Sequence, residues 1–394
     1  MNIKLSDRLS AVKPSPTLAI TARAAEMRAA GKDIIGLGAG EPDFDTPENI
    51  KAAAIKAINN GFTKYTAVDG TPSLKQAVID KFKNDNGFEY TLKQILVSSG
   101  GKQSFYNLAQ ALLNKGDEVI IPAPYWVSYP DIVLLADAIP VIIKTTQAQN
   151  FKISPAQLRA AITDKTRLFV INSPSNPTGV AYSLGELQAL ADVLLDFPNV
   201  IVATDDMYEH ILWKKGSFVN ILNACPELYN RTMVLNGVSK AYSMTGWRIG
   251  YAAGPEDIIA GMRKVQSQST SNPTSISQVA AEEALRGDQS CIDTMLVEFK
   301  KRHDFVVDEL NKMPGIKCIK SDGTFYVFPN VENLIVELEG INNDLDLAEF
   351  FIKRADVSLV PGSAFGCPGH IRISIATSME NLQNALQRIK KAIA

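Results

Sequence analysis

The sequence predicts an α/β protein with a large domain built on a mostly parallel sheet and a second, smaller α/β domain. Two observations support this prediction. Between residues 95 and 270, apolar runs typical of strands alternate with helical patterns, which favours a parallel sheet covered on both faces. Beyond Pro314 the order changes to short strands between helices, which indicates a second unit. The length of 394 residues is sufficient for both.

Composition narrows the class of protein. Apolar residues make up 46% of the chain and charged residues 21%, as in an ordinary enzyme. The net charge is -2 and no long basic run occurs, so we expect neither a nucleic acid nor an anionic membrane as partner. The first residues are polar and do not resemble a secretory signal, and no apolar run approaches the roughly 20 residues that span a bilayer.

Cysteine and histidine spacing argues against metal binding. The four cysteines lie far apart without a C-x-x-C pair, so we expect neither a disulfide framework nor a zinc site. The three histidines do not cluster either, and we predict no metal. Reduced, dispersed cysteines fit a cytoplasmic protein best.

The amino-terminal part predicts three helices. Residues 20–30 have a helical pattern that Gly31 ends. Residues 47–60 form the next helix, with Thr46 as N-cap and Pro47 in the first turn. The third covers residues 74–84, where apolar residues recur at helical spacing.

A glycine-rich stretch lies between the first two helices. Gly36, Gly38 and Gly40 are spaced G-x-G-x-G and are followed by Glu-Pro. A dinucleotide-binding motif needs a helix to begin at its last glycine, which this sequence does not allow. The glycines indicate instead that the backbone closely approaches something.

The remaining elements follow from periodicity. In the large domain we expect strands at 95–97, 118–121, 168–172, 200–204, 232–235 and 249–253, with helices at 103–113, 155–163, 184–196 and 255–270. A long helical region covers 275–312 and is broken near Gly287. In the small domain we expect strands at 325–328, 357–360 and 371–375, with helices at 345–354 and 379–393.

Polar and glycine-rich residues follow several of these strands. In open parallel sheets ligands bind outside the carboxyl ends of the strands, so residues between 98 and 248 are expected to converge on one site. The turn 98–102 opens a helix, and such a turn suits a phosphate group, although it can also serve packing alone.

Two basic residues stand out. Lys240 comes shortly after an apolar strand, and because desolvation lowers the pKa of a lysine, such an amine can react with a carbonyl cofactor. A lysine in a surface loop is the alternative. Arg372 lies in the strand 371–375, opposite in direction to its isoleucines, where it suits the binding of a carboxylate. A solvated strand face is the alternative.

Taken together, the motifs resemble those of a known family, the class I aminotransferases, which are pyridoxal-phosphate enzymes of fold type I. The resemblance is strongest to the bacterial aspartate aminotransferase subgroup, some members of which also transaminate prephenate. It covers essentially the whole chain and rests on AGEPDF (39–44), KY (64–65), GGKQ (100–103), PYWVSY (124–129), NSPSNPTG (172–179), DDMYE (205–209), SK (239–240), MTGWRIGY (244–251) and RIS (372–374).

The resemblance implies a fold and a domain organisation. A seven-stranded, mostly parallel sheet between helices would form the large domain, residues 46–295. The small α/β domain would comprise residues 296–394, and residues 1–45 would pack with it. The family forms homodimers, in which Tyr65 would reach the phosphate of the cofactor in the neighbouring subunit.

The resemblance also implies roles around pyridoxal 5′-phosphate. Lys240 would bind it covalently and move a proton as general base and acid. Asp205 would keep the pyridine nitrogen protonated, while Asp206 would serve a turn or support the residues that contact the cofactor. Tyr208 and Asn176 would hydrogen-bond the ring 3′-oxygen.

Further residues would hold the cofactor and the substrate. Trp126 would stack on the cofactor ring. The phosphate would be held by Gly101, Lys102 (both through main-chain N–H groups), Ser239 and Arg248. Substrate would meet Gly40, Trp126, Asn176, Arg372 and Lys13, with Arg372 on the α-carboxylate and Lys13 on a distal carboxylate. Gly237 departs from the family pattern, which has a hydroxyl residue there, so one phosphate contact is expected to be missing or replaced.

The expected activity is transfer of an amino group from L-aspartate, or a similar dicarboxylic amino acid, to 2-oxoglutarate. The alternatives are a prephenate or aromatic aminotransferase and a carbon–sulfur lyase on the same fold. Two further classes are a pyridoxal-phosphate regulator, for which a DNA-binding extension is missing, and a nicotinamide dehydrogenase.

Overall fold

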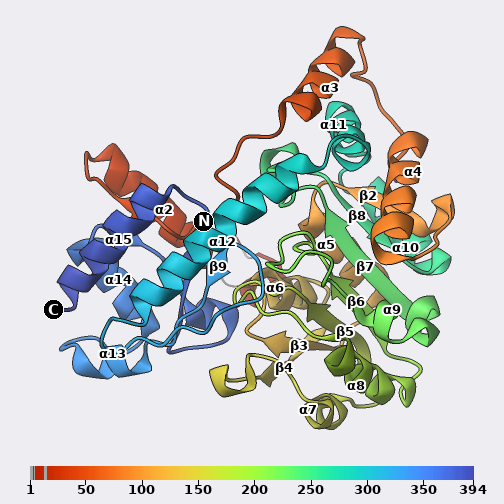
Figure 1. Ribbon diagram of the computed structural model, residues 1–394. Coiled ribbons are helices and arrows are strands. Elements are labelled where there is room, and N and C mark those ends of the chain that lie inside the picture. The colour runs from red at the N-terminus through yellow and green to blue at the C-terminus, as the bar shows by residue number, and fades with distance from the viewer. Residues whose placement is uncertain (1–2, 4, 13–15) are drawn as a thin grey trace.

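A computed structural model describes residues 3, 5–12 and 16–394. Figure 1 shows two units side by side. One is a twisted sheet surrounded by helices, and the other is a smaller group of helices and short strands. The helix α12 extends from one unit to the other. The expected large and small α/β units are therefore both present.

The large unit is built on a seven-stranded sheet of order β2-β8-β7-β6-β5-β3-β4. Its strands are β2 (Ile95–Ser98), β3 (Glu118–Ala123), β4 (Ile139–Lys144), β5 (Thr166–Asn172), β6 (Ile201–Asp205), β7 (Thr232–Gly237) and β8 (Gly250–Ala253). The strands β4, β3, β5, β6 and β7 pair in parallel, whereas β8 runs antiparallel to both of its neighbours. The mostly parallel sheet that the sequence predicts is confirmed.

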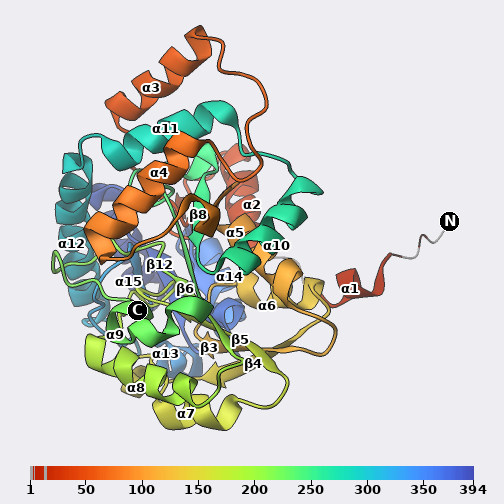
Figure 2. The same ribbon diagram turned by 90° about the vertical axis from the view of Figure 1, so that its right-hand side faces the viewer.

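Both faces of this sheet are covered by helices. On β7, Met233 and Leu235 pack into one apolar cluster and Val234 into another, because successive side chains of a strand point to opposite faces. The first cluster includes residues of α5 (Gly101–Leu112), α6 (Ser128–Leu135) and α10 (Glu256–Ser267). The second includes residues of α3 (Glu48–Asn59), α4 (Pro72–Lys81), α7 (Pro155–Ala161), α8 (Leu184–Leu195), α9 (Ile221–Ala224) and α11 (Ser275–Arg286). Figure 2 shows α3, α4 and α11 above the sheet.

The strand β4 and the helix α6 have no counterpart among the elements expected from sequence. The apolar run of β4 contains Pro140, and a proline within a run argues against a strand. However, β4 is an edge strand, and at an edge a residue without an N–H group can be tolerated.

One expected helix cap is wrong. The helix α3 begins at Glu48, and its N-cap is Pro47, with no side-chain cap. Thr46 instead donates a hydrogen bond to the carbonyl of Ser243, at 2.7 Å, and accepts one from the indole N–H of Trp247, at 2.9 Å. A residue chosen as a local cap thus connects the chain to the turn that follows Lys240.

The smaller unit contains a three-stranded antiparallel sheet of order β11-β12-β9. Its strands are β9 (Tyr326–Val327), β11 (Val360–Pro361) and β12 (Ile371–Ser374), and its helices are α12 (Ser290–Leu310), α13 (Glu332–Glu337), α14 (Asp344–Arg354) and α15 (Met379–Ala392). The expected strand 357–360 is in fact two strands, because β10 (Val357–Ser358) pairs with β1 (Ile35–Gly36) rather than with this sheet.

The amino-terminal segment packs on the smaller unit. β1 pairs in parallel with β10, and α2 (Pro16–Ala29) contacts β10 and β11. The short α1 (Asp7–Ser10) lies apart from this segment (Figure 2). The break near Gly287 is confirmed between α11 and α12, but the predicted domain boundary at 295/296 falls inside the continuous α12 and stays a prediction. Among the described residues no helix is both long and apolar enough to cross a membrane.

Candidate active site

A cavity of about 410 Å³ lies at the carboxyl ends of β5, β6 and β7 and extends to the smaller unit. Of the thirteen site residues expected from sequence, eleven line it: Gly40, Gly101, Lys102, Trp126, Asn176, Asp205, Tyr208, Ser239, Lys240, Arg248 and Arg372. Tyr65 does not line it, and Lys13 lies outside the described residues. The expected convergence therefore occurs, while the chemical role of each residue stays a prediction.

Arg248 reaches this site because of the one reversed strand. It precedes β8, and since β8 is antiparallel to β7, the start of β8 lies at the same edge as the ends of the parallel strands. The sequence places Arg248 with residues that follow strands, and the topology gives the physical reason why it joins them.

Lys240 lies in the turn after β7 with its amine in the cavity. The amine donates a hydrogen bond to the carbonyl of Gly40, at 2.5 Å, and lies 5.9 Å from the ring centre of Phe325. Burial, followed by the positive charge of Arg372, lowers the pKa of Lys240 to about 8. Roughly a tenth of this amine is therefore neutral and nucleophilic at pH 7, far more than for a lysine with the ordinary pKa.

Asp205 ends β6 and lines the cavity. Its Oδ2 accepts a short hydrogen bond from the phenol of Tyr129, and its Oδ1 accepts the N–H of Met207 at 3.3 Å. Burial raises the pKa of Asp205, and both hydrogen bonds act against that rise. The carboxylate is thus held in one orientation, and its oxygens keep lone pairs for a further donor.

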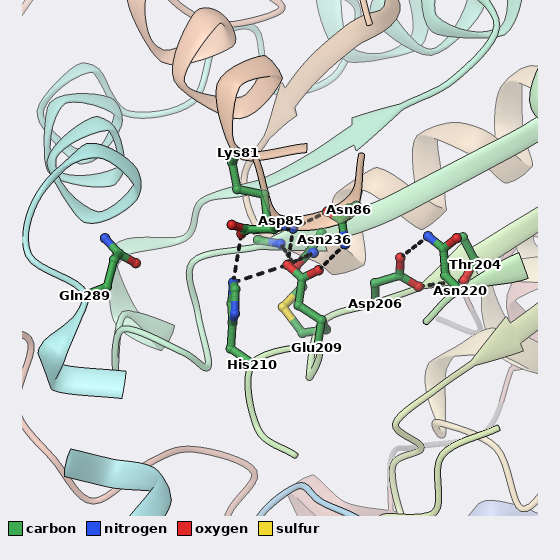
Figure 3. Close-up of polar contacts among 12 residues, drawn as sticks. Lys81, Asp85, Asn86, Thr204, Asp206, Glu209, His210, Asn220, Asn236 and Gln289 are labelled. Atoms are coloured by element: carbon green, nitrogen blue, oxygen red, sulfur yellow. Dashed lines mark hydrogen bonds and ion pairs between the residues drawn. The ribbon is translucent and has the colours of Figure 1, made fainter. Parts of the chain in front are cut away.

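Asp206 lies elsewhere. It is buried, and its carboxyl accepts hydrogen bonds from Thr204, at 2.6 Å, and Asn220, at 2.8 Å. Figure 3 shows this group beside a second polar cluster, outside the set of residues that lines the cavity. Its burial raises its pKa to about 7.

An anion site lies at the first turn of α5. Gly100 has a φ of 91°, which few other residues adopt, and a Cβ there would collide with the guanidinium of Arg248. The free N–H groups at the start of α5, together with the cavity-lining Ser239 and Arg248, suit a phosphate. At Gly237 a Cβ would lie 3.0 Å from Cα of Gly250, so the glycine matches the close pairing of β7 with β8.

Arg372 is buried in β12 and faces the cavity. Its Nη1 donates to Oδ1 of Asn176, at 2.9 Å, and its Nη2 donates to the carbonyl of Gly38, at 2.7 Å. Its Nε is buried and has no hydrogen-bond partner among the residues that the structure describes. A buried guanidinium with an unused donor is suited to an anionic ligand such as a carboxylate.

The remaining groups are three tyrosines, Trp126 and the amine of Lys102. The phenols of Tyr208 and Tyr326 lie 3.0 Å apart, and both are buried. Trp126 makes an edge contact with Tyr129, with ring centres 5.2 Å apart, and the amine of Lys102 lies 5.4 Å from the indole ring. Burial and the charge of Arg248 lower the pKa of Lys102.

A second polar cluster surrounds Glu209 (Figure 3). Glu209 forms an ion pair with Lys81 and accepts hydrogen bonds from Asn236, at 2.7 Å, and Asn86, at 3.0 Å. Because Glu209 follows Tyr208 and Asn236 lies on β7, the cluster connects the segments that carry Tyr208 and Lys240.

This cluster also includes three side chains with ligand atoms within 4.8 Å of one another, namely Asp85, Glu209 and His210. The ammonium of Lys81 already contacts Glu209 and lies 3.7 Å from Asp85. A metal ion there would have to displace this charge, so we interpret the group as an ion-pair network.

Sequence reasoning assigned no role to Tyr129, Tyr326 or Glu41, although Tyr326 and Glu41 line the cavity and Tyr129 contacts Asp205. Tyr326 lies in an expected strand where all four residues are apolar or aromatic, and periodicity does not show which of them faces a ligand. The position of Tyr129 depends on α6, which was not expected.

Comparisons with known proteins agree with this geometry. A sequence model of the family described as "Aminotransferase class I and II" matches residues 32–389. The chain is 61% identical to the aspartate/prephenate aminotransferase of Nitrosomonas europaea over the full length of both chains. It is 53% identical to the aspartate/prephenate aminotransferase of Cereibacter sphaeroides over 98% of each.

Solved structures of aspartate aminotransferases have the same fold as this chain. An aspartate aminotransferase from Rhizobium meliloti has a TM-score of 0.96 at 47% identity, covering 100% of this chain and 99% of that chain. An aspartate aminotransferase from Thermus thermophilus with maleate has a TM-score of 0.93 at 39% identity, covering 99% of this chain and 100% of that chain.

Proposed function

Because the chain belongs to the class I and II aminotransferase family, we propose that it transfers the amino group of a dicarboxylic amino acid, L-aspartate first, to 2-oxoglutarate. The enzyme is an aminotransferase, and its cofactor is pyridoxal 5′-phosphate. The observation that carries the proposal of amino transfer is that Lys240, Asp205 and Arg372, which lie far apart in sequence, line one cavity.

The residues of the cavity fit this cofactor. A half-buried amine with a pKa of about 8 lies near a carboxylate, and an anion site opens at the start of α5. When bound, pyridoxal 5′-phosphate supplies an aldehyde that combines with amines and a ring that takes up the electron pair of the substrate Cα.

The protein's own groups then have defined tasks. Gly101, Lys102, Ser239 and Arg248 would hold the phosphate. Asp205 would hold a proton at the pyridine nitrogen, since Tyr129 keeps the carboxylate oriented and stabilises its charged form. Tyr208 and Asn176 would donate hydrogen bonds to the ring oxygen, and Trp126 would cover one ring face.

Substrate would be bound from the smaller unit. Arg372 would bind the α-carboxylate, with Nε as its free donor. The amine of Lys240 would then remove the proton from the substrate Cα, because it is neutral in part near its pKa of about 8. Closely packed aromatic side chains around Arg372 would exclude water from this step.

A dicarboxylic substrate needs a second cation. Of the described cations that line the cavity, Lys240, Arg248 and Arg372 already have proposed tasks, which leaves the side chain of Lys102. Lys13 remains the other candidate. If either binds the distal carboxylate, Lys102→Met or Lys13→Ala will lower kcat/KM for aspartate about tenfold or more while leaving that for alanine nearly unchanged.

The names of the relatives favour a second amino-group acceptor. Both named relatives are aspartate/prephenate aminotransferases, so we propose prephenate as an alternative substrate. The decisive experiment incubates the purified enzyme with aspartate and either 2-oxoglutarate or prephenate and measures the amino product and kcat/KM. No amino product in this assay, together with release of a thiol, an oxo acid and ammonia from a thioether amino acid, would instead indicate a carbon–sulfur lyase.

We also propose a cytoplasmic homodimer. Tyr65 is 92% exposed, and on the neighbouring helix α3 Ile55 and Ile58 are 57% and 51% exposed, as expected of a surface that a second copy covers. The four cysteines are free, which supports a reducing compartment.

A further inference from the structure

We propose that Tyr326 couples the two halves of the active site, because its hydroxyl supports the phenol of Tyr208 and its ring carries the guanidinium of Arg372. Tyr326 thus acts on both the cofactor side and the substrate side. This inference rests on the proposed function and deepens it by naming a positioning residue of the same site.

Tyr326 lies on the strand that pairs with the strand of Arg372. It is fully buried on β9, and it lies opposite Ser374 of β12. Arg372 is two residues before Ser374, so the side chains of Arg372 and Ser374 point to the same face of β12. The ring of Tyr326 can therefore reach diagonally across the strand pair to Arg372.

The contact with Arg372 is close. Its guanidinium carbon lies 4.4 Å from the ring centre of Tyr326 and 4.9 Å from that of Phe365. Two rings thus support a buried cation that donates to two acceptors within the described part of the chain. Desolvated contacts of this kind are among the stronger cation–π interactions. The ring of Tyr326 keeps the guanidinium in place for a carboxylate.

The hydroxyl of Tyr326 contacts the hydroxyl of Tyr208. The phenol oxygens of Tyr208 and Tyr326 lie 3.0 Å apart, and each phenol has one proton to donate. If the proton of Tyr208 goes to the cofactor oxygen, the proton of Tyr326 is the one that bonds Tyr208. The result is a chain of donors from Tyr326 through Tyr208, and such chains strengthen each member.

The geometry leaves Tyr326 few other tasks. A Cβ on Gly40 would lie 3.0 Å from the Tyr326 oxygen, so the glycine leaves space for this hydroxyl beside the backbone that contacts Lys240. Tyr326 also lines the cavity. Its position is thus next to the reacting groups rather than in the packed interior of the smaller unit alone.

The test separates the hydroxyl from the ring. In Tyr326→Phe, the ring stays under Arg372 and the hydroxyl is lost. We expect the midpoint of the pH titration of the bound cofactor's visible absorbance to rise by about 0.5 to 1 pH unit, as the loss of one hydrogen bond predicts. The dissociation constant for succinate, a dicarboxylate that lacks an amine, should change less than about threefold, because the cation–π contact persists.

In Tyr326→Leu both contacts are lost. We expect the same rise in the titration midpoint and, in addition, a dissociation constant for succinate that is about tenfold or more higher than in the wild type. Tyr182→Phe is the matched control, since Tyr182 is a buried phenol that accepts the N–H of Ile153, at 2.9 Å, and does not line this cavity. The control should leave both readouts unchanged.

An unchanged titration midpoint in Tyr326→Phe would overturn the proposal, and unchanged succinate binding in a folded Tyr326→Leu would overturn the role of the ring. If Tyr326→Leu does not fold, Tyr326→Phe still decides the role of the hydroxyl, because it preserves the packing, and Tyr326→Met takes the place of Tyr326→Leu as the test of the ring. A wild-type protein that binds the cofactor but does not convert aspartate would refute the proposed function, and the titration would still test Tyr326.

Discussion

The reactive amine of Lys240 is half-buried, so water stabilises its charge less well than on the protein surface. Burial and Arg372 lower its pKa to about 8, while Glu41 and Asp205 act in the opposite direction. One positive group thus tunes the amine and is also positioned to bind the substrate carboxylate. The same arrangement that recognises substrate makes the amine reactive before substrate arrives.

This gives a pH-dependent prediction for the apoenzyme. Only the neutral amine captures the cofactor aldehyde, so the capture rate should rise with pH and be half-maximal near pH 8, measured by stopped-flow absorbance. In Arg372→Leu the midpoint should move up toward the ordinary lysine pKa. Arg388→Leu, which removes an arginine that contacts Asp33 on the outside of the protein, is the control. A wild-type midpoint near 10 would contradict this account.

At the scale of elements, the site depends on a buried ion-pair network that connects α4 to β7. Burial alone would raise the pKa of Glu209, but Lys81, His210 and neighbouring amides outweigh it and lower that pKa to about 2. The ion pair is only 3% exposed on both sides. Removing one partner would leave an uncompensated charge behind Tyr208.

We therefore expect Lys81→Met to destabilise the protein by about 3–5 kcal/mol at pH 7, as for other broken buried pairs. In the wild type, the stabilisation by Glu209 is complete above the unfolded-state pKa of about 4.3 and is lost as pH falls toward 2. In the variant, burial without the charge of Lys81 should raise the pKa of Glu209, so the carboxylate takes up a proton and loses its unpaired charge as pH falls. The difference between the two proteins should therefore shrink as pH falls from 7 to 4.

Denaturant unfolding at pH 7, 5.5 and 4 measures this difference. The control is Lys215→Met, which breaks the exposed pair with Asp293 and should cost no more than about 1 kcal/mol. A Lys81→Met deficit as small as that of the control, or one that grows toward pH 4, would show that the network does not stabilise the fold in this way.

Most strands of the large sheet, but not all, could be predicted from the sequence. Six of the seven sheet strands follow from their apolar runs, and parallel topology alone predicts that residues after them meet. The seventh, β4, is concealed by Pro140, which only its edge position makes acceptable. The split of 357–360 between two sheets depends on pairing with β1, and no local pattern reports a partner over 300 residues away.

In the site, too, some residues could be predicted from the sequence and others could not. Lys240 and Arg372 could be singled out because charged residues are unusual in or beside apolar strands, whereas Tyr326 and Tyr129 are aromatic residues in places where aromatic residues are common. Their importance follows from two contacts, one with Tyr208 and one with Asp205. Such contacts depend on tertiary structure, which periodicity does not describe.

At the scale of the whole molecule, the proposed site is incomplete in one copy of the chain. Tyr65 is 92% exposed and does not line the cavity of its own chain. If it contacts the cofactor phosphate in a partner, two defective chains should complement each other. A hybrid of Lys240→Ala and Tyr65→Ala chains would contain one site with both defects and one site with neither.

We predict that subunit exchange between these two variants restores activity. At a cofactor concentration that leaves the Tyr65→Ala homodimer mostly empty, the mixture should approach one wild-type site per hybrid dimer. Unmixed Lys240→Ala and Tyr65→Ala samples serve as controls. Activity no greater than the sum of the two parents, with exchange verified by native mass spectrometry, would show that Tyr65 does not act across the interface.

The most direct measurement for the central claim is the covalent site of the cofactor. Borohydride reduction of the holoenzyme, followed by proteolysis and mass spectrometry, should place a phosphopyridoxyl group on Lys240 and nowhere else, and the Lys240→Ala protein should carry none. A label on another lysine, or no label although the cofactor is bound, would contradict the assignment of Lys240 and the mechanism built on it.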